Sequence, residues 1–458
     1  MEDAITGAYI VAFSLFIIGM RMLTHPTTAR RGNMIAAVGM AIAVVATLLK
    51  EDVGDYGLIA VGIAIGTAVG IPSARSVRMT AMPQMVALFN GVGGGAVALI
   101  AFAEFRHAGG HLPSEELIPI LFAAIVGSIS FWGSNIAFGK LQELIPGRPI
   151  SVPGQQVVNG ALALVAVGAA VAIAAGSESE GLFLLLLVAA AVLGNMVVLP
   201  IGGADMPVVI SLLNALTGLS AAAAGLALDN TALIVGGMIV GASGSILTNL
   251  MAKAMNRSIA NIVAGGFGGV TTSASADGDE DRTVRSTSAA DVAIQLAYAD
   301  QVVVVPGYGL AVAQAQHAVR EMADILEKKG ITVQYAIHPV AGRMPGHMNV
   351  LLAEADVPYD SLREMEEINP DFPRTDVSIV IGANDVTNPA ARDVQDSPIY
   401  GMPILDVDKS ESVIVLKRSM ASGFAGIDNP LFYDEKTSML FGDAKASVDE
   451  VISELKAL

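Results

Sequence analysis

The sequence of 458 residues contains no cysteine, and only 15% of its residues are charged and 5% aromatic. The absence of cysteine excludes disulfide bonds, thiolate metal sites and a cysteine nucleophile. The low charged fraction, beside 53% hydrophobic residues, disfavours a disordered chain and is typical of a membrane protein. The net charge of -17 disfavours nucleic acid as a partner, because phosphate contacts need clustered lysine and arginine.

The few charges are unevenly distributed along the chain. Residues 1–255 hold 23 Lys, Arg, Asp and Glu, whereas residues 256–458 hold 46. The first part is too apolar for water, and the second has the charge density of an ordinary globular domain. We therefore predict a transmembrane domain over 1–255 and a water-exposed domain near the carboxyl end.

Nine segments of the first part are long and apolar enough to cross a bilayer, which takes about 20 residues in a helix. The predicted spans are 4–23, 33–49, 56–73, 82–103, 116–138, 157–176, 181–201, 206–227 and 230–251. The loops that follow odd-numbered spans hold nine Lys and Arg residues, against two in the even-numbered loops, Lys50 and Arg106. Because cations in short loops stay on the cytoplasmic side, we expect the carboxyl-terminal domain in the cytoplasm.

Several predicted spans carry glycine at helical spacing. Examples are Gly62, Gly66 and Gly70, or Gly237 and Gly241. Small residues at this spacing let helix backbones approach closely in lipid, so we predict that these glycines pack against neighbouring helices.

The composition changes after residue 255. Glycine, serine, threonine and aspartate dominate residues 264–285, which favours a mobile linker within 256–285. Apolar β-rich runs then alternate with helical patterns, which predicts a Rossmann-like doubly wound parallel sheet over 286–458. The predicted strands are 302–305, 331–337, 377–381, 403–405 and 413–416, and the predicted helices include 310–328 and 445–458.

The first predicted strand runs directly into a glycine-rich turn. Its sequence is Gly307-Tyr308-Gly309-Leu310-Ala311-Val312. A turn of this kind after a strand and before a helix is typical of a dinucleotide pyrophosphate site, with a structural glycine turn as the alternative. The third position of the fingerprint is Val312 instead of glycine, so the motif alone is weak.

The end of the second predicted strand favours one cofactor over another. An NAD site usually has a carboxylate there for the ribose hydroxyl, whereas this chain has Arg343 nearby and no carboxylate. The later Lys417-Arg418-Ser419 adds two cations that suit a 2′-phosphate, although an ordinary solvated strand end would look the same. We predict NADP(H) as the cofactor bound by this chain.

Polar residues within the spans are candidates for an ion pathway, because they are costly in lipid, with interhelical hydrogen bonding as the alternative. They are Asn90, Ser130, Ser134, Asn135, Asn195, Ser211, Asn214 and Thr217, together with Asp205 at the start of a span. No histidine lies in the middle of a span, and the sequence suggests neither a metal cluster nor a catalytic triad.

Long stretches of the chain resemble one known family, the β subunit of the proton-translocating NAD(P) transhydrogenase, over essentially the full length. The stretches that carry the resemblance are 202–208, 253–257, 264–268, 306–316, 338–354, 381–390, 417–420 and 440–448.

The resemblance implies an integral membrane enzyme that transfers hydride between NAD(H) and NADP(H) and couples this to proton movement. It implies that NADP(H) is held by residues 307–312, Arg343, the 381–385 loop and Lys417-Arg418-Ser419, beneath a lid near residues 422–429. The cofactor-binding residues expected from the loop and the lid are Gly382, Asn384, Asp385, Gly423, Phe424 and Ala425.

The resemblance further implies that Asp385 links nucleotide state to proton state, and that Asn90, Asp205 and Asn214 lie near the proton route. Two residues depart from the family pattern. Asn90 stands where many bacterial members have histidine, and Phe424 stands where tyrosine is frequent. The titrating imidazole is therefore absent here or supplied by a partner's span.

Only one nucleotide fingerprint occurs in this chain, so NAD(H) must bind a separate α subunit, which we expect to add further membrane helices. The resemblance also implies a dimer of the whole complex in the bacterial cytoplasmic membrane. The rival hypothesis is an ion or solute transporter gated by a cytoplasmic nucleotide-binding domain. Such domains usually have the carboxylate that is missing after the second strand.

Overall fold

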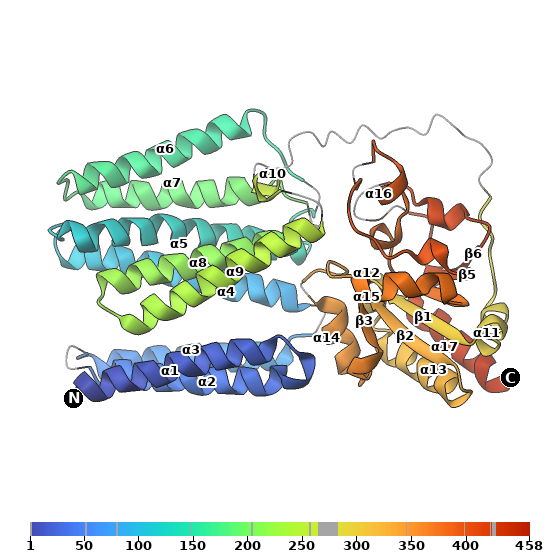
Figure 1. Ribbon diagram of the computed structural model, residues 1–458. Helices are drawn as coiled ribbons and strands as arrows, with labels where there is room; N and C mark the ends of the chain where they lie inside the picture. Colours follow the sequence, from blue (N-terminus) through green and yellow to red (C-terminus); the bar gives the residue numbers. More distant parts are fainter. Residues whose placement is uncertain are drawn as a thin grey trace. The chain divides into compact units, whose positions relative to one another are not determined.

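The computed structural model describes residues 2–458 apart from 51–52, 79–80, 148, 203–204, 256–257, 264–282, 345, 398, 422 and 424–426. The chain forms two compact units (Figure 1), one built from residues up to Thr248 and the other from Asn249–Ile262 and the described residues after 282. The central part of the predicted linker lies outside the described residues, and a short helix, α10 (Ile259–Val263), precedes it.

Nine helices among the described residues are long and apolar enough to cross a membrane, as predicted. They are α1 (Glu2–Leu23), α2 (Pro26–Leu48), α3 (Tyr56–Ser76), α4 (Met82–His107), α5 (Ser114–Leu141), α6 (Gln155–Ala174), α7 (Glu180–Val198), α8 (Met206–Ala227) and α9 (Thr231–Ala254). Large apolar side chains point outward from them; Leu58, Val157 and Leu164 are each more than 70% exposed. Such a surface is suited to lipid.

Glycine lets several of these helices approach each other closely. A Cβ atom on Gly127 of α5 would lie 2.7 Å from the carbonyl oxygen of Gly94 in α4, and one on Gly237 of α9 would lie 2.5 Å from that of Gly218 in α8. Packing by Gly237 and Gly241 is thus confirmed. The same prediction for α3 is wrong among the described residues, because a Cβ on Gly62, Gly66 or Gly70 would meet nothing within 4 Å.

The second unit contains a six-stranded sheet in the order β3-β2-β1-β4-β5-β6, with every neighbouring pair parallel. Its strands are β1 (Gln301–Pro306), β2 (Thr332–Ile337), β3 (Leu362–Glu364), β4 (Val377–Ile381), β5 (Ser412–Lys417) and β6 (Thr437–Phe441). This strand order is that of the Rossmann fold, so the predicted doubly wound sheet is confirmed.

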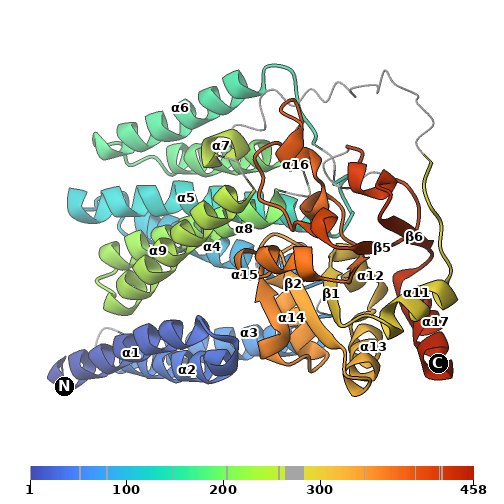
Figure 2. The ribbon, with the colours of Figure 1, turned by 45° about the vertical axis from the view of Figure 1, so that its right-hand side comes forward.

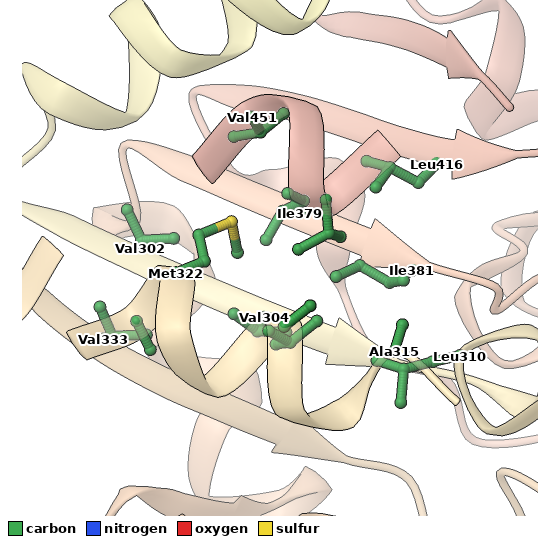
Figure 3. Packing of buried hydrophobic residues seen from close by; sticks show 14 of the residues in the cluster. Val302, Val304, Leu310, Ala315, Met322, Val333, Ile379, Ile381, Leu416 and Val451 are labelled. Carbon is green, nitrogen blue, oxygen red and sulfur yellow. The ribbon is translucent and has the colours of Figure 1, made fainter. Parts of the chain in front are cut away.

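Both faces of the sheet are covered, which explains why the central strands are continuously apolar. Val302 and Val304 of β1 point to one face, and Val303 and Val305 point to the other. Figure 3 shows Met322 and Val451 packed over the first of these faces, and Figure 2 shows the helices that carry them side by side. The helices on this face are α11 (Ala289–Ala297), α12 (Tyr308–Ala313), α13 (Gln316–Lys328), α14 (His347–Glu354) and α17 (Ala444–Ala457).

Shorter elements cover the second face or lie at the ends of the strands. They are η2 (Tyr359–Ser361), α15 (Met365–Ile368), η3 (Asn369–Arg374), η4 (Asp385–Thr387), α16 (Ala390–Asp393), η5 (Val407–Lys409) and η6 (Pro430–Tyr433).

Two predicted elements of this unit are wrong. Residues 403–405 form no strand, because their backbone bonds to three separate segments outside the sheet: His338 contacts the Pro403 carbonyl, Asn369 donates to that of Ile404, and Leu405 N–H donates to Val386. The predicted helix 310–328 is two helices, because Gln314 adopts the left-handed conformation with φ 52° between α12 and α13.

Candidate functional site

Three glycines join the carboxyl ends of β1 and β4. Gly309 N–H donates to the carbonyl of Gly382 at 3.0 Å, and Gly307 N–H donates to that of Ile381 at 2.9 Å. A Cβ on Gly307 would overlap the Gly382 oxygen, and one on Gly309 would lie 2.7 Å from the Gly382 Cα. The glycines of the fingerprint are therefore required first of all by this backbone contact, which the sequence did not predict.

The strand register places the predicted site segments next to one another. Pro306 of β1 pairs with Ile381 of β4, and Ile381 pairs with Leu416 of β5. The next residues along these strands are Gly307, Gly382 and Lys417, so three segments far apart in sequence leave the sheet at one edge. The strand order reverses between β1 and β4, which is where ligands bind in open α/β sheets.

Arg343 contributes a cation on the β2 side of this edge. Its guanidinium carbon lies 4.3 Å from the centre of the Tyr308 ring, within the range of a cation–π contact. The backbone N–H of Arg343 donates to Nδ1 of His347 at 3.0 Å, and the His347 ring lies 6.2 Å from that of Tyr308. Arg343 is thus held against the glycine-rich turn by its ring contact and by its main chain.

The environment of His347 keeps its imidazole neutral. The side chain is 1% exposed, and burial, with a smaller contribution from the charge of Arg343, lowers its pKa to about 4. Because Nδ1 accepts the Arg343 N–H, the neutral ring carries its proton on Nε2. This nitrogen has no hydrogen-bond partner among the described residues.

Beyond β4, Asn384 and Asp385 lie beside the segment predicted as a lid. Asn429 donates through Nδ2 to the main-chain and side-chain oxygens of Asn384, at 3.1 and 3.0 Å. A Cβ on Gly423 would lie 2.6 Å from Oδ1 of Asp385, so a larger residue at this position would displace the ends of these two side chains. The Asn384 Nδ2 atom is buried without a hydrogen-bond partner in the described part of the chain.

The cations after β5 differ in their surroundings. The Lys417 ammonium donates to the Ala421 carbonyl at 2.6 Å and lies 4.5 Å from the centre of the Phe432 ring. Burial lowers the pKa of Lys417, against the opposing effects of Asp385 and Asp428. Arg418 and Ser419 are exposed. This edge of the sheet therefore offers two cations to an anionic ligand: Lys417, which is partly buried, and Arg418, which is exposed.

The remaining predicted residues of this site fall into two groups. Leu310 and Ala311 are buried in the core, so only their backbone can face a ligand, whereas Val312 is 46% exposed. Phe424 and Ala425 lie outside the described residues, as does Ser422.

In the helical unit, Asn90 joins a hydrogen-bonded polar cluster between α4, α5 and α8. Its Nδ2 atom donates to Ser134 at 2.9 Å and to Ser130 at 3.3 Å. The Ser130 hydroxyl contacts that of Thr217 at 2.5 Å and the Leu213 carbonyl at 3.1 Å. Asn90 Oδ1 is buried and has no partner among the described residues, so the cluster retains an acceptor for a water or a proton donor.

Asp205 and Asn214 are both on α8 but at different depths. Asp205 is the N-cap residue of the helix, and its carbonyl accepts from the N–H groups of Val208 and Val209. Asn214 is half-buried and lies three residues, about one turn, before Thr217. The helix thus connects Asp205 at its end to the Asn90 cluster.

Reasoning from sequence missed several residues. Asn388 donates to the Asp428 carbonyl at 3.0 Å and, with Asn429, fixes the region after β4 to the lid segment. The signal for both residues was an asparagine directly before proline, a common turn initiator. Lys140, which is almost fully buried, was used only to orient the spans.

Comparison with known proteins identifies the family. The family model described as "NAD(P) transhydrogenase beta subunit" matches residues 5–454. The NAD(P) transhydrogenase subunit beta of Rhodospirillum rubrum is 51% identical over 456 residues, covering 97% of this chain and 98% of that protein. The subunit from a particular strain of the same species has the same identity and coverage. The chain therefore belongs to the NAD(P) transhydrogenase beta subunit family, as an enzyme subunit with multiple membrane spans.

Proposed function

We propose that this chain binds NADP(H) at the carboxyl edge of its sheet, while NAD(H) binds the α subunit. The observation that carries the proposal is the convergence of Gly307–Gly309, Gly382–Asp385 and Lys417–Ser419 at the point where the strand order reverses. Two features of the site fit a phosphorylated dinucleotide. The donor set is cationic, and the Asn384 amide offers a buried donor with no partner among the described residues.

Each part of the site has a separate role in this proposal. Lys417 and Arg418 hold the 2′-phosphate, because ammonium and guanidinium groups form strong charge-assisted hydrogen bonds with phosphate. Arg343, fixed over Tyr308, faces the pyrophosphate with the β1–α12 turn. Asn384 and Asp385 lie beneath the lid, against its residue Gly423.

The bound nucleotide supplies the hydride chemistry at its nicotinamide ring, and the protein aligns and shields it. Asp385 lies beside the lid residue Gly423, so its protonation state bears on whether the lid is closed. No catalytic acid or base is required from this chain for hydride transfer itself.

The proton route is proposed to follow α8, from Asp205 past Asn214 to the cluster of Asn90, Ser130 and Thr217. Hydroxyl and amide groups joined by hydrogen bonds can relay a proton through water without titrating themselves. Coupling then follows from reciprocal linkage: proton occupancy changes the NADP(H) affinity, and bound nucleotide changes proton affinity by the same factor.

Calorimetric titration of the full-length chain in lipid nanodiscs tests the cofactor assignment. NADPH and NADP⁺ should bind at least ~100-fold more tightly than NADH and NAD⁺, a difference of about 2.7 kcal/mol. The double variant Lys417→Gln with Arg418→Gln should lose this preference. A preference of the unaltered chain for NAD(H), or no binding, contradicts the proposal and favours a gated transporter.

The proton route is tested in proteoliposomes that contain the complex with its α subunit. Internal acidification during hydride transfer should be lost in Thr217→Val and retained in Ser243→Ala, which removes an exposed hydroxyl on α9 that donates to the Val240 carbonyl of its own helix. Equal proton transport by both variants contradicts the route along α8.

A further inference from the structure

Lys140 is a buried cation at the end of a membrane-spanning helix. It occupies the last turn of α5 and is only 3% exposed. A charged side chain in such a place is costly and tends to be retained for function. Lys140 is neither one of the proposed nucleotide-binding residues nor one of the residues that define the polar cluster around Asn90.

The ammonium of Lys140 holds the end of a different helix. It donates to the main-chain carbonyl of Leu199 and, at 2.8 Å, to that of Ile201. The Leu199 carbonyl also accepts the N–H of Ile150, at 3.1 Å. These carbonyls follow the last residue of α7, where the helix dipole is negative and a cation is stabilised.

The residues held by Lys140 precede Asp205, the N-cap residue of α8, by a few positions in the sequence. Ile201 is four residues before Asp205, whose N–H donates to the Gly202 carbonyl at 3.1 Å. Asp205 in turn accepts the first hydrogen bonds of α8, the helix that carries Asn214 and Thr217. The position of the Asp205 backbone is thereby linked to the position of the α5 ammonium.

A second side chain reinforces this connection from α4. The amide of Gln84, itself buried, donates to the Leu141 carbonyl at 3.2 Å, directly after Lys140. Helices α4, α5 and α8 are those that supply the Asn90 cluster, about six residues or ~9 Å deeper along α5. One junction at this end thus fixes the three helices that line the proposed route.

We propose that Lys140 is a positioning residue for proton transfer: its ammonium fixes the main chain at Leu199 and Ile201, and so sets the nearby Asp205 at the mouth of the polar route. The inference rests on the proposed proton route along α8. A cationic donor with the reach of lysine is needed, because two main-chain carbonyls that follow α7 must be satisfied at once. A neutral side chain of the same length leaves both carbonyls without this donor.

The test compares three variants of the full complex in proteoliposomes: Lys140→Met, Lys140→Arg and Lys50→Met. Lys50 is a matched control, because its ammonium also donates to an inter-helix carbonyl, that of Asp229, at 2.8 Å. Asp229 follows the opposite end of α8, away from Asp205. Each variant is characterised by kcat and KM for hydride transfer, by the number of protons moved per hydride, and by the Kd for NADPH.

Lys140→Met should lower kcat for proton-coupled transfer by on the order of tenfold to a hundredfold, because small displacements of catalytic geometry have effects of this size. Its KM and NADPH Kd should stay within about twofold of the unaltered complex. Lys140→Arg should recover most of the lost kcat, and Lys50→Met should behave as the unaltered complex does.

Two results overturn the inference. One is a Lys140→Met complex with unchanged kcat and unchanged proton yield. The other is equal loss in Lys140→Met and Lys50→Met, which indicates a general loss of stability. Failure of the proposed function is recognised separately, because the unaltered complex then moves no protons during hydride transfer.

Discussion

Asn429 bonds through one amide nitrogen to both oxygens of Asn384, with distances of 3.1 Å to the main-chain and 3.0 Å to the side-chain oxygen. Asn429 is 1% exposed, so its amide makes these hydrogen bonds away from bulk water. This pair joins the segment after β4 to the end of the predicted lid.

Replacement of Asn429 by alanine should weaken NADPH binding by about tenfold, because unsatisfied buried acceptors cost about 1–3 kcal/mol. Stopped-flow fluorescence of bound NADPH should show the change mainly as faster release. Asn349→Ala, which removes an exposed hydrogen bond to Glu364, is the control. Unchanged release from Asn429→Ala contradicts a role of this pair in holding the nucleotide.

Gly309→Ala should destabilise the sheet unit by about 1–3 kcal/mol, the usual cost of forcing an atom into a packed backbone contact. The new Cβ would lie 2.7 Å from the Cα of Gly382, where neither chain can rotate away. Differential scanning calorimetry without nucleotide separates this effect from lost binding. Gly147→Ala, where a Cβ meets nothing within 4 Å, should leave the transition unchanged.

NADPH affinity should fall at alkaline pH, and should begin to fall below the ordinary lysine pKa of 10.5. Burial lowers the pKa of Lys417, so the ammonium loses its proton, and its attraction for phosphate, earlier than an exposed lysine does. Lys417→Arg should remove this decline, because guanidinium stays protonated throughout. The check is Kd against pH for both proteins; identical profiles exclude Lys417 as the titrating group.

The sheet unit should lose stability as pH falls from about 6.5, the ordinary pKa of histidine, to about 4, the pKa of His347 in the folded chain. In this window the unfolded chain binds a proton that the folded chain does not, so stability falls with pH by up to about 3 kcal/mol. Calorimetry at several pH values should show a shallower acid slope for His347→Asn, which retains an acceptor for the Arg343 N–H. An identical slope for the variant assigns the acid sensitivity to other groups.

The cysteine-free sequence allows a direct test of orientation. Leu144→Cys lies after α5 and Glu178→Cys lies between α6 and α7, both at exposed positions. With the carboxyl-terminal domain in the cytoplasm, an impermeant maleimide added to intact cells should label the Glu178→Cys variant and leave the other unlabelled. Labelling of Leu144→Cys from outside reverses the assigned topology.

The sequence was sufficient to predict the elements whose side chains all face one kind of environment, either lipid or the interior of the protein. The nine spans follow from apolar length, and β1 follows from four consecutive valines that are buried on both faces of the sheet. Strand β3 was missed because Leu362-Arg363-Glu364 is short and largely polar. Strand β6 was missed as well, and 403–405 was predicted as a strand although its hydrogen-bond partners lie outside the sheet.

The sequence was sufficient to predict which segments form the candidate site, but not which residues of those segments contact each other. The glycine-rich turn and the Lys417-Arg418 pair were visible as local patterns. The contact of Gly309 with Gly382 and that of Asn429 with Asn384 join residues 73 and 45 positions apart, as their numbers show, and no local pattern indicates such pairs. The contacts of Lys140 were not predicted for the same reason, since its partners Leu199 and Ile201 follow α7, about 60 positions later in the sequence.

The strand order has a consequence for how the protein is made. Strand β1 pairs with β2 on one edge and with β4 on the other, yet Ile381, the end of β4, is translated 75 residues after Pro306, as the numbering shows. At about 5–20 residues per second, the nascent chain carries the uncovered edge of this valine-rich strand for roughly 4–15 s. Such an edge is a template for aggregation, so ribosome-associated chaperones have most to protect between the synthesis of β1 and that of β4.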